Sequence, residues 1–163
     1  MKEIVNNSID EFRMHFGNNI EIELRKNTIS VRDFERGIQQ GKMIYAVSLM
    51  LYGCRTPEGW TIQQVKPGGA RLANALSASF TVKSFRDGMV KQADFVRGKL
   101  VNEYDLVPTT EKNGTYVEIT PDEEIFGNYK FHKGYLEGMV RKFSYTNIGL
   151  TLNFNGKKFL IEK

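Results

Sequence analysis

Three pairs of neighbouring segments in this chain alternate between apolar and polar residues, and a turn of two or three residues separates the members of each pair. The pairs are 20–25 with 28–33, 80–85 with 89–97, and 150–154 with 157–161. Alternation with a period of two indicates half-buried strands, and the Asn155-Gly156 turn of the last pair is a strong signal for a tight hairpin. Strands joined in this way predict a mixed, largely antiparallel sheet.

Several of the remaining segments have helical periodicity. We expect helices over 2–16, 43–51, 70–77 and 133–145, a helical turn over 121–124, further strands over 100–106 and 115–120, and mostly loop over 55–69. The apolar faces of the first and last helices are expected to be Val5, Ile9, Phe12 and Phe16, and Tyr135, Leu136, Met139, Val140 and Phe143. One apolar face per helix predicts an α+β fold, a two-layer sandwich with about eight strands and with helices on one face of the sheet.

Composition narrows the class of protein. The chain has 163 residues, which predicts a single domain, and its 23 basic and 19 acidic residues give a mild net charge of +4. A nucleic-acid surface is therefore allowed but not indicated. Cys54 is the only cysteine, which excludes an internal disulfide and a multi-cysteine metal site. No signal peptide or membrane span is recognisable, so we expect a cytoplasmic protein with no membrane partner.

The first helix carries a polar line opposite its apolar face. Glu3, Asn7 and Asp10 are spaced by four and three residues, which places two carboxylates and an amide on one side. A carboxylate can polarise a water, and an amide oxygen can coordinate Mg²⁺ beside phosphates. Taken alone, such a line is more often a solvated helix face.

Two further stretches could contact a ligand. Asp33 ends a strand and begins a loop with Gly37, where a carboxylate could accept a hydrogen bond from an exocyclic amine and a glycine lets the backbone approach a flat ring. The alternative is an ordinary turn. Residues 66–69 (Lys-Pro-Gly-Gly) precede a helix and could bind an anion through backbone N–H groups, although they match no known phosphate-loop motif.

Together these motifs resemble a known family. Residues 3–11 resemble the helix that opens the nucleotide site in the B subunits of bacterial type II topoisomerases, DNA gyrase and topoisomerase IV, most closely those of the Bacteroides group. Residues 31–38 resemble the Asp-x-Gly-x-Gly-Ile loop of that family, 74–77 resemble the helix after its Gly-rich lid, and Gly114-Thr115 resembles the start of a later pocket strand. The resemblance covers nearly the whole chain and implies the GHKL ATPase sandwich.

The resemblance also implies a role for each matching residue. Glu3 would be the catalytic general base that aligns the attacking water, Asn7 would hold Mg²⁺ and phosphate, and Asp33 would bind the adenine amine. The other nucleotide-binding positions would surround the adenine ring (Gly37, Ile38, Thr115), line the pocket mouth (Arg36, Arg86), extend the helix line (Asp10) or face the phosphates (Gly69).

The chain departs from the family pattern mainly on the phosphate side. Glu35 stands where the family has the first glycine of its loop, and Gln39 stands where it has a proline. The Gly-rich phosphate loop is reduced to residues 66–69, and residues 50–55 replace a Gly-Gly-Lys type of lid sequence. The N-terminal dimerisation arm and the transducer domain are also expected to be absent. Fewer backbone N–H donors predict weaker phosphate binding.

The resulting prediction is an ATP-binding domain of a type II topoisomerase B subunit that uses ATP and Mg²⁺. In the full enzyme, with DNA and the A subunit, ATP hydrolysis would drive strand passage. Alone, the chain is expected to be a monomer that binds nucleotide or an adenine-site inhibitor and turns over little or not at all. The alternatives are a nucleotide-silent scaffold or interaction module and, with less support, direct DNA binding by the basic surface.

Overall fold

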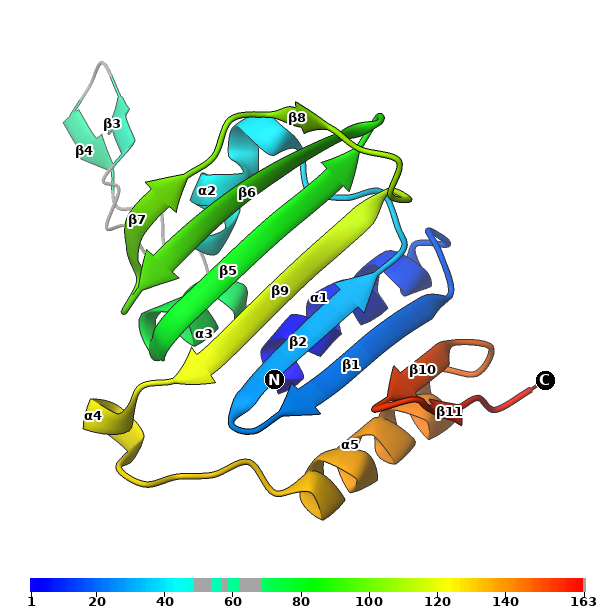
Figure 1. Cartoon of the computed structure of the whole chain (residues 1–163). Helices are drawn as coiled ribbons and strands as arrows, with labels where there is room; N and C mark the ends of the chain where they lie inside the picture. Colours follow the sequence, from blue (N-terminus) through cyan, green and yellow to red (C-terminus); the bar gives the residue numbers. More distant parts are fainter. Residues whose placement is uncertain (49–53, 57–58, 62–68, 163) are drawn as a thin grey trace.

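The computed structural model describes residues 1–48, 54–56, 59–61 and 69–162. Its main feature is a nine-stranded sheet (Figure 1). The strands of this sheet are β1 (Asn19–Arg25), β2 (Thr28–Asp33), β5 (Ser77–Arg86), β6 (Met89–Val96), β7 (Lys99–Glu103), β8 (Val107–Pro108), β9 (Gly114–Pro121), β10 (Thr151–Phe154) and β11 (Lys157–Phe159). Their order is β11-β10-β1-β2-β9-β5-β6-β7, and β8 pairs with β6. Only the β1–β10 pair is parallel, so the mixed, mostly antiparallel sheet is confirmed.

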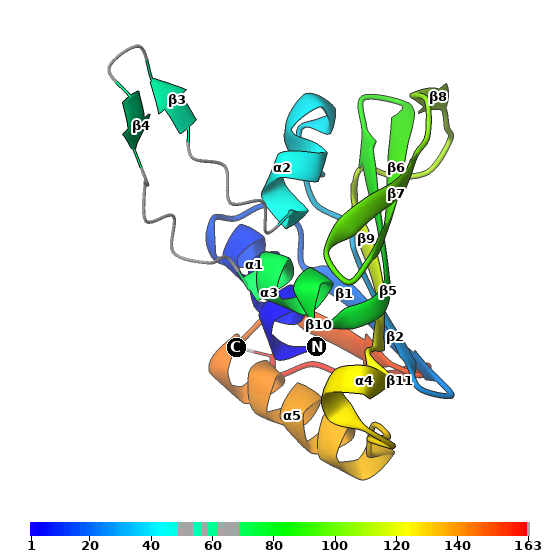
Figure 2. The ribbon, with the colours of Figure 1, turned by 90° about the vertical axis from the view of Figure 1, so that its left-hand side faces the viewer.

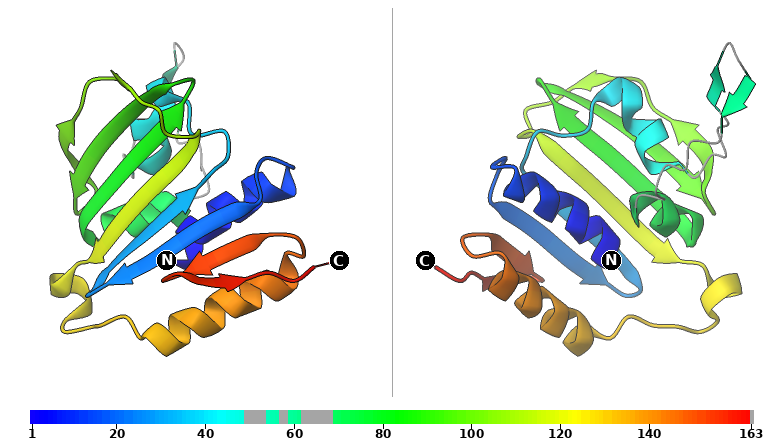
Figure 3. Two further views of the ribbon diagram at one scale, coloured as in Figure 1. Left: turned by 45° about the vertical axis from the view of Figure 1, so that its right-hand side comes forward. Right: turned by 180° about the vertical axis from the view of Figure 1, so that it is seen from behind.

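The helices lie on one side of this sheet, as expected from their single apolar faces. They are α1 (Lys2–Arg13), α2 (Met43–Val47), α3 (Gly69–Ala75), α4 (Glu123–Phe126) and α5 (Lys133–Thr146), with a short 3-10 turn over Gln40–Lys42. Figure 2 shows α1, α2, α3 and α5 on the same side of the sheet, and the right-hand view in Figure 3 shows them in front of it. The described part of the chain is therefore a two-layer α+β sandwich, with no helix long and apolar enough to cross a membrane.

The hairpin turns have the backbone geometry that the sequence indicates. Asn155 and Gly156 both take positive φ angles, 48° and 81°, which is the geometry of the two-residue turns that suit the twist of paired strands. Asp87 and Gly88 do the same between β5 and β6, at 55° and 74°. The turn between β6 and β7 is also of this kind, although its sequence, Arg-Gly, gives a weaker signal.

The core lies between the helices and the inward side of the sheet. On β1, Ile20 and Ile22 are buried while Glu21 is exposed, and Ile22 pairs with Val31 of β2. The same side of β9 and β5 contributes further buried residues, among them Phe80. Since alternate residues of each strand face opposite sides, this register leaves charged and hydroxyl side chains on the uncovered side.

Several details of the sequence prediction are wrong. The first helix ends at Arg13, because His15 and Gly17 take positive φ angles, and Phe16 therefore lies beyond the helix with 38% of its surface exposed. Tyr135 is exposed on α5, whereas Leu136 and Val140 are buried. The structure contains eleven strands in its described residues, because β3 (Cys54–Thr56) and β4 (Gly59–Thr61) pair within the segment expected to be mostly loop, and β8 is additional.

Candidate functional site

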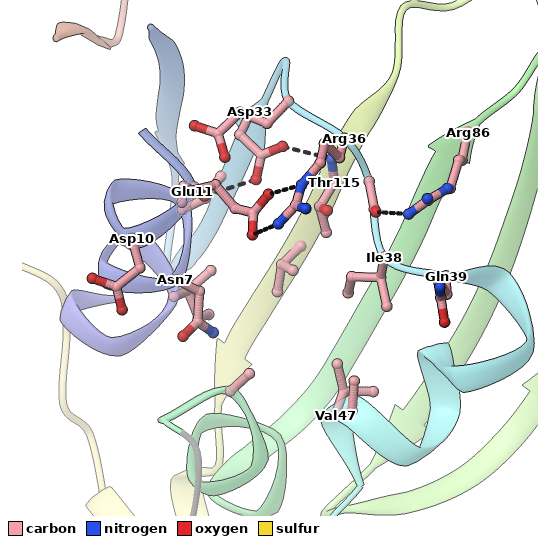
Figure 4. A pocket seen from close by; sticks show the side chains of 18 residues that line it. Asn7, Asp10, Glu11, Asp33, Arg36, Ile38, Gln39, Val47, Arg86 and Thr115 are labelled. Carbon is pink, nitrogen blue, oxygen red and sulfur yellow. Dashed lines mark hydrogen bonds and ion pairs between the residues drawn. The ribbon is translucent and has the colours of Figure 1, made fainter. Parts of the chain in front are cut away.

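A cavity of about 520 Å³ opens between α1, the loop after β2, the start of β9 and α2 (Figure 4). Eight of the residues singled out from the sequence line it: Asn7, Asp10, Asp33, Arg36, Gly37, Ile38, Arg86 and Thr115. Its apolar wall comes from both layers of the sandwich, from Ile4, Val31, Ala46, Val47, Ala70 and Val117. A concave, mostly apolar site with a few convergent polar groups is typical of a small-molecule pocket.

Asp33 is a buried carboxylate of the cavity that receives hydrogen bonds from two other elements of the fold. It is only 6% exposed, and its two carboxylate oxygens accept hydrogen bonds from the Ser8 hydroxyl and the Thr115 backbone N–H, both at 2.8 Å. Burial raises the pKa of Asp33, while these two donors act in the opposite direction. The carboxylate is thus held in one orientation by α1 and β9, and each of its oxygens keeps a lone pair for a ligand. Sequence reasoning missed Ser8, because a serine inside a helix gives no distinctive signal.

Gly37 lets the loop after β2 lie close against two strands. Its φ angle is 75°, and a Cβ there would lie 2.5 Å from the Phe85 carbonyl oxygen and 3.0 Å from that of Gly114. Arg86 donates to the Gly37 carbonyl at 3.1 Å, and Ser84 donates to that of Ile38 at 2.5 Å. The position therefore requires glycine for both backbone conformation and space.

Arg36 lies at the edge of the cavity but is already paired. Its guanidinium donates to both carboxylate oxygens of Glu11 on α1, at 2.7 and 2.8 Å, and stacks 3.7 Å from the centre of the Phe16 ring. This bidentate pair connects the loop to the helix in the geometry that arginine and carboxylate prefer (Figure 4).

Glu35 differs from every other charged residue of the site. It is 6% exposed, and neither of its carboxylate oxygens has a hydrogen-bond partner in the described part of the chain. Burial and the nearby Asp33 and Glu11 carboxylates raise its pKa to about 9. Its Cγ lies beneath the turn after α1, where a Cβ on Gly17 would lie 2.6 Å away.

Glu3 and Gly69 lie together, outside the cavity that the other eight residues share. A Cβ added to Gly69 would fall within 2.3 Å of the Glu3 side chain, so the glycine is needed for this contact. Glu3 lines a second, more apolar cavity of about 350 Å³ beside Leu72 and Phe126. Residues 66–68 of the Gly-rich segment and the side chain of Cys54 lie outside the described residues.

Two side chains of α3 hold the end of α2 against the cavity. Asn74 is fully buried and donates to the Val47 carbonyl at 2.8 Å, while Arg71 donates to the carbonyls of Tyr45 and Ala46 at 3.1 and 3.4 Å. These are carbonyls in the last turn of a five-residue helix, which has too few internal hydrogen bonds to be stable alone. The α2 wall of the cavity therefore depends on α3.

The described residues contain no group of three or more His, Cys, Asp or Glu side chains that could hold a metal ion. Asn7, on an exposed position of α1, contributes an amide to the lining of the cavity, and Gln39 contributes another. One amide oxygen fits a magnesium ion that takes its other ligands from water and substrate phosphates.

Comparison with known proteins gives B subunits of bacterial type II topoisomerases among the relatives of this chain. The chain is 39% identical over 163 residues to the B subunit of DNA topoisomerase 4 from Borreliella burgdorferi. It is 29% identical to the B subunit of DNA gyrase from Streptococcus pyogenes and 31% identical to that of the type 2 topoisomerase from Aquifex aeolicus. The matches cover 98%, 99% and 89% of this chain but 27%, 27% and 20% of those proteins, so the chain spans about a quarter of their length. A scan against protein-family models matches none.

A solved structure supports the same relationship in three dimensions. The 43K ATPase domain of Thermus thermophilus gyrase B, determined in complex with an aminocoumarin, superimposes with a TM-score of 0.77 and 30% sequence identity. The superposition covers 99% of this chain and 45% of that one. The chain is therefore homologous to the B subunits of bacterial type II topoisomerases, over the part of those proteins that folds as the gyrase B ATPase domain.

Proposed function

We propose that this chain binds ATP in the cavity between α1 and the sheet. The observation that carries the proposal is Asp33, a buried carboxylate oriented by Ser8 and Thr115 in a cavity large enough for a base and sugar. An exocyclic adenine amine would donate to this carboxylate, and the close-packed backbone at Gly37 leaves the ring room to lie beside Ile38. Homology to the gyrase B ATPase domain points to the same ligand.

The polar residues at the rim suit the rest of the nucleotide. Asn7 would contribute an amide oxygen to Mg²⁺, which supplies charge neutralisation for the phosphates. Arg86, which is half-buried and bonded to the loop, lies at the cavity edge, and Asp10 extends the α1 line there. Phosphate contacts from the described residues are few, so we expect the base half of the ligand to supply most of the affinity.

Glu3 is the proposed general base. Its side chain lies against Gly69 and lines the second cavity, away from Asp33, so we expect this chain alone to hydrolyse ATP slowly or not at all. In a complete B subunit, ATP binding and hydrolysis would drive strand passage with DNA and the A subunit. We expect the isolated chain to be a monomer.

A thermal-shift titration tests this function. Three ligands are titrated separately: Mg-ATP, adenosine and an aminocoumarin. A ligand that binds only the folded state stabilises it by about 2.7 kcal/mol at 100 times its Kd. A rise in Tm with all three supports the proposal. A rise in Tm with the aminocoumarin alone means that the part of the cavity for the base is intact but that the chain binds no nucleotide. No rise with any ligand favours the alternative of a nucleotide-silent scaffold.

A further inference from the structure

The carboxyl group of Glu35 occupies a space that is built for it but offers it no hydrogen bond. Both oxygens are buried and without a partner in the described part of the chain, although the residue lines the cavity that contains Asp33. The space exists because Gly17 has no side chain: a Cβ there would lie 2.6 Å from the Glu35 Cγ and 3.0 Å from the Phe34 carbonyl oxygen. A buried carboxylate without donors is costly, whereas a neutral carboxyl in the same place costs much less.

The charges around Glu35 also oppose its ionisation. Asp33 faces it from the end of β2 and Glu11 from α1, and both are carboxylates. Among the described residues, Arg36 is the cation that acts on Glu35, and it already forms two hydrogen bonds with Glu11; Arg32 acts on Asp33 and donates to its backbone carbonyl. The turn after α1 adds His15, which is exposed. An ionised Glu35 would thus be a third carboxylate in a cluster whose two arginines already have other partners.

Asp33 and Glu35 differ in the hydrogen-bond donors that are available to their ionised forms. Asp33 receives hydrogen bonds from a hydroxyl and a backbone N–H, which stabilise a carboxylate, and Glu35 receives none. When two neighbouring acids cannot both ionise, the one with the donors keeps the charge and the other keeps the proton.

We propose that the site carries a negative charge on Asp33 and a proton on Glu35, and that nucleotide binding requires this division of charge. This proposal rests on the proposed function, because it describes the state in which the same site binds its ligand. An ionised Glu35 would leave its pocket beneath Gly17 for solvent and disturb the loop from Asp33 to Gly37 that surrounds the base.

Unfolding at different pH values tests the proton without any ligand. Urea unfolding is measured from pH 5 to pH 9 for the wild type, Glu35→Gln and a control, Glu123→Gln, on an exposed residue of α4. A group that keeps its proton when folded and loses it when unfolded raises the unfolding constant by up to about tenfold per pH unit between its two pKa values. We expect the full dependence in the wild type and the control, and in Glu35→Gln only the smaller part that Asp33 contributes. Parallel profiles for wild type and Glu35→Gln would overturn the proposal.

A second measurement covers the case in which Glu35→Gln does not fold. In wild-type protein with ¹³C-labelled glutamate carboxyl groups, one resonance should titrate near pH 9, far above the ordinary glutamate range. If every glutamate carboxyl titrates below pH 6, Glu35 holds no proton at neutral pH and the proposal fails.

Ligand binding tests the second half of the proposal. The Kd of adenosine and of Mg-ATP is measured at pH 8 and pH 10 by calorimetry. We expect the wild-type Kd for both probes to rise about tenfold, since one proton must be regained, and the Glu35→Gln Kd to stay constant. Equal pH dependence in the two proteins overturns the link to binding. If neither probe binds at any pH, the proposed function fails, while the unfolding profiles still decide whether Glu35 holds a proton.

Discussion

Replacing Asp33 with asparagine removes one charge and leaves the shape of the site intact. The remaining oxygen can still accept from the Thr115 N–H at 2.8 Å, and the new amide can donate to the Ser8 hydroxyl, which rotates to accept. Burial raises the pKa of Asp33, so the folded state loses stability as the pH rises through that value. Asparagine does not titrate, and we therefore expect the Tm of Asp33→Asn at neutral pH to equal or exceed that of the wild type.

Binding should respond in the opposite way. The variant presents an amide N–H₂ or a neutral oxygen where the ligand amine needs a charged acceptor. A hydrogen bond to a charged group contributes about 1.5–3 kcal/mol, which corresponds to a rise in Kd of about tenfold to about 150-fold. Because the change lies at the base, adenosine and Mg-ATP should lose the same factor.

Isothermal titration with both ligands measures the effect, and Ser8→Ala serves as the matched control. That variant removes one donor to Asp33 but keeps the acceptor, so its loss should stay near tenfold or below. The reasoning is refuted if Asp33→Asn binds adenosine as tightly as the wild type. A loss for Mg-ATP alone would also contradict it, because the carboxylate would then act on the phosphate side.

Three further substitutions test the framework around the site by urea unfolding. Gly37→Ala should lower the free energy of unfolding by about 3 kcal/mol. Gly88→Ala, at nearly the same φ angle but with open space around it, should lower it by about 1 kcal/mol. Equal losses would show that the contact with the Phe85 carbonyl is unimportant. Asn74→Ala removes the hydrogen bond to the end of α2 and should cost about 1–3 kcal/mol and weaken ligand binding as well. Phe80→Ala, in the centre of the sheet, should cost about 3–5 kcal/mol, and a loss below about 1 kcal/mol would place this ring outside the core.

The strands were predictable where the sequence repeats a pattern often enough. All eight expected strands exist, because alternation over several residues and turns such as Asn155-Gly156 fix both the strand and its connection. The missed strands β3, β4 and β8 have only two or three residues each, too few for a period to show. Phe16 shows the opposite error. Its helical spacing predicts that it belongs to the apolar face of the first helix, but that helix ends at Arg13 and Phe16 is exposed.

The site itself was not predictable from periodicity. Ser8 and Asp33 are 25 residues apart, and Asp33 and Thr115 are 82 apart, so only the register of β2 with β9 and the packing of α1 bring them together. Asp33 is a candidate from its place at a strand end, the family resemblance adds its role toward adenine and the position Thr115, and Ser8 emerges only from the structure. For Glu3 the resemblance supplied a role, but the side chain lies against Gly69, outside the cavity.

Glu35 departs from the family pattern, which has a glycine at this position, but this departure does not have to weaken phosphate binding. A carboxylate at the wall of a nucleotide site should repel phosphates, and on sequence alone Glu35 counts against ATP binding. The structure turns its side chain beneath Gly17, where a charge has no donors, so the residue is better accommodated as a neutral acid. The loop has Glu35 where the family has a glycine, and Gly17 in the facing turn provides the space that the larger side chain needs. A neutral Glu35 places no negative charge near the phosphates of the ligand. Any weakness in phosphate binding must then arise elsewhere in the site.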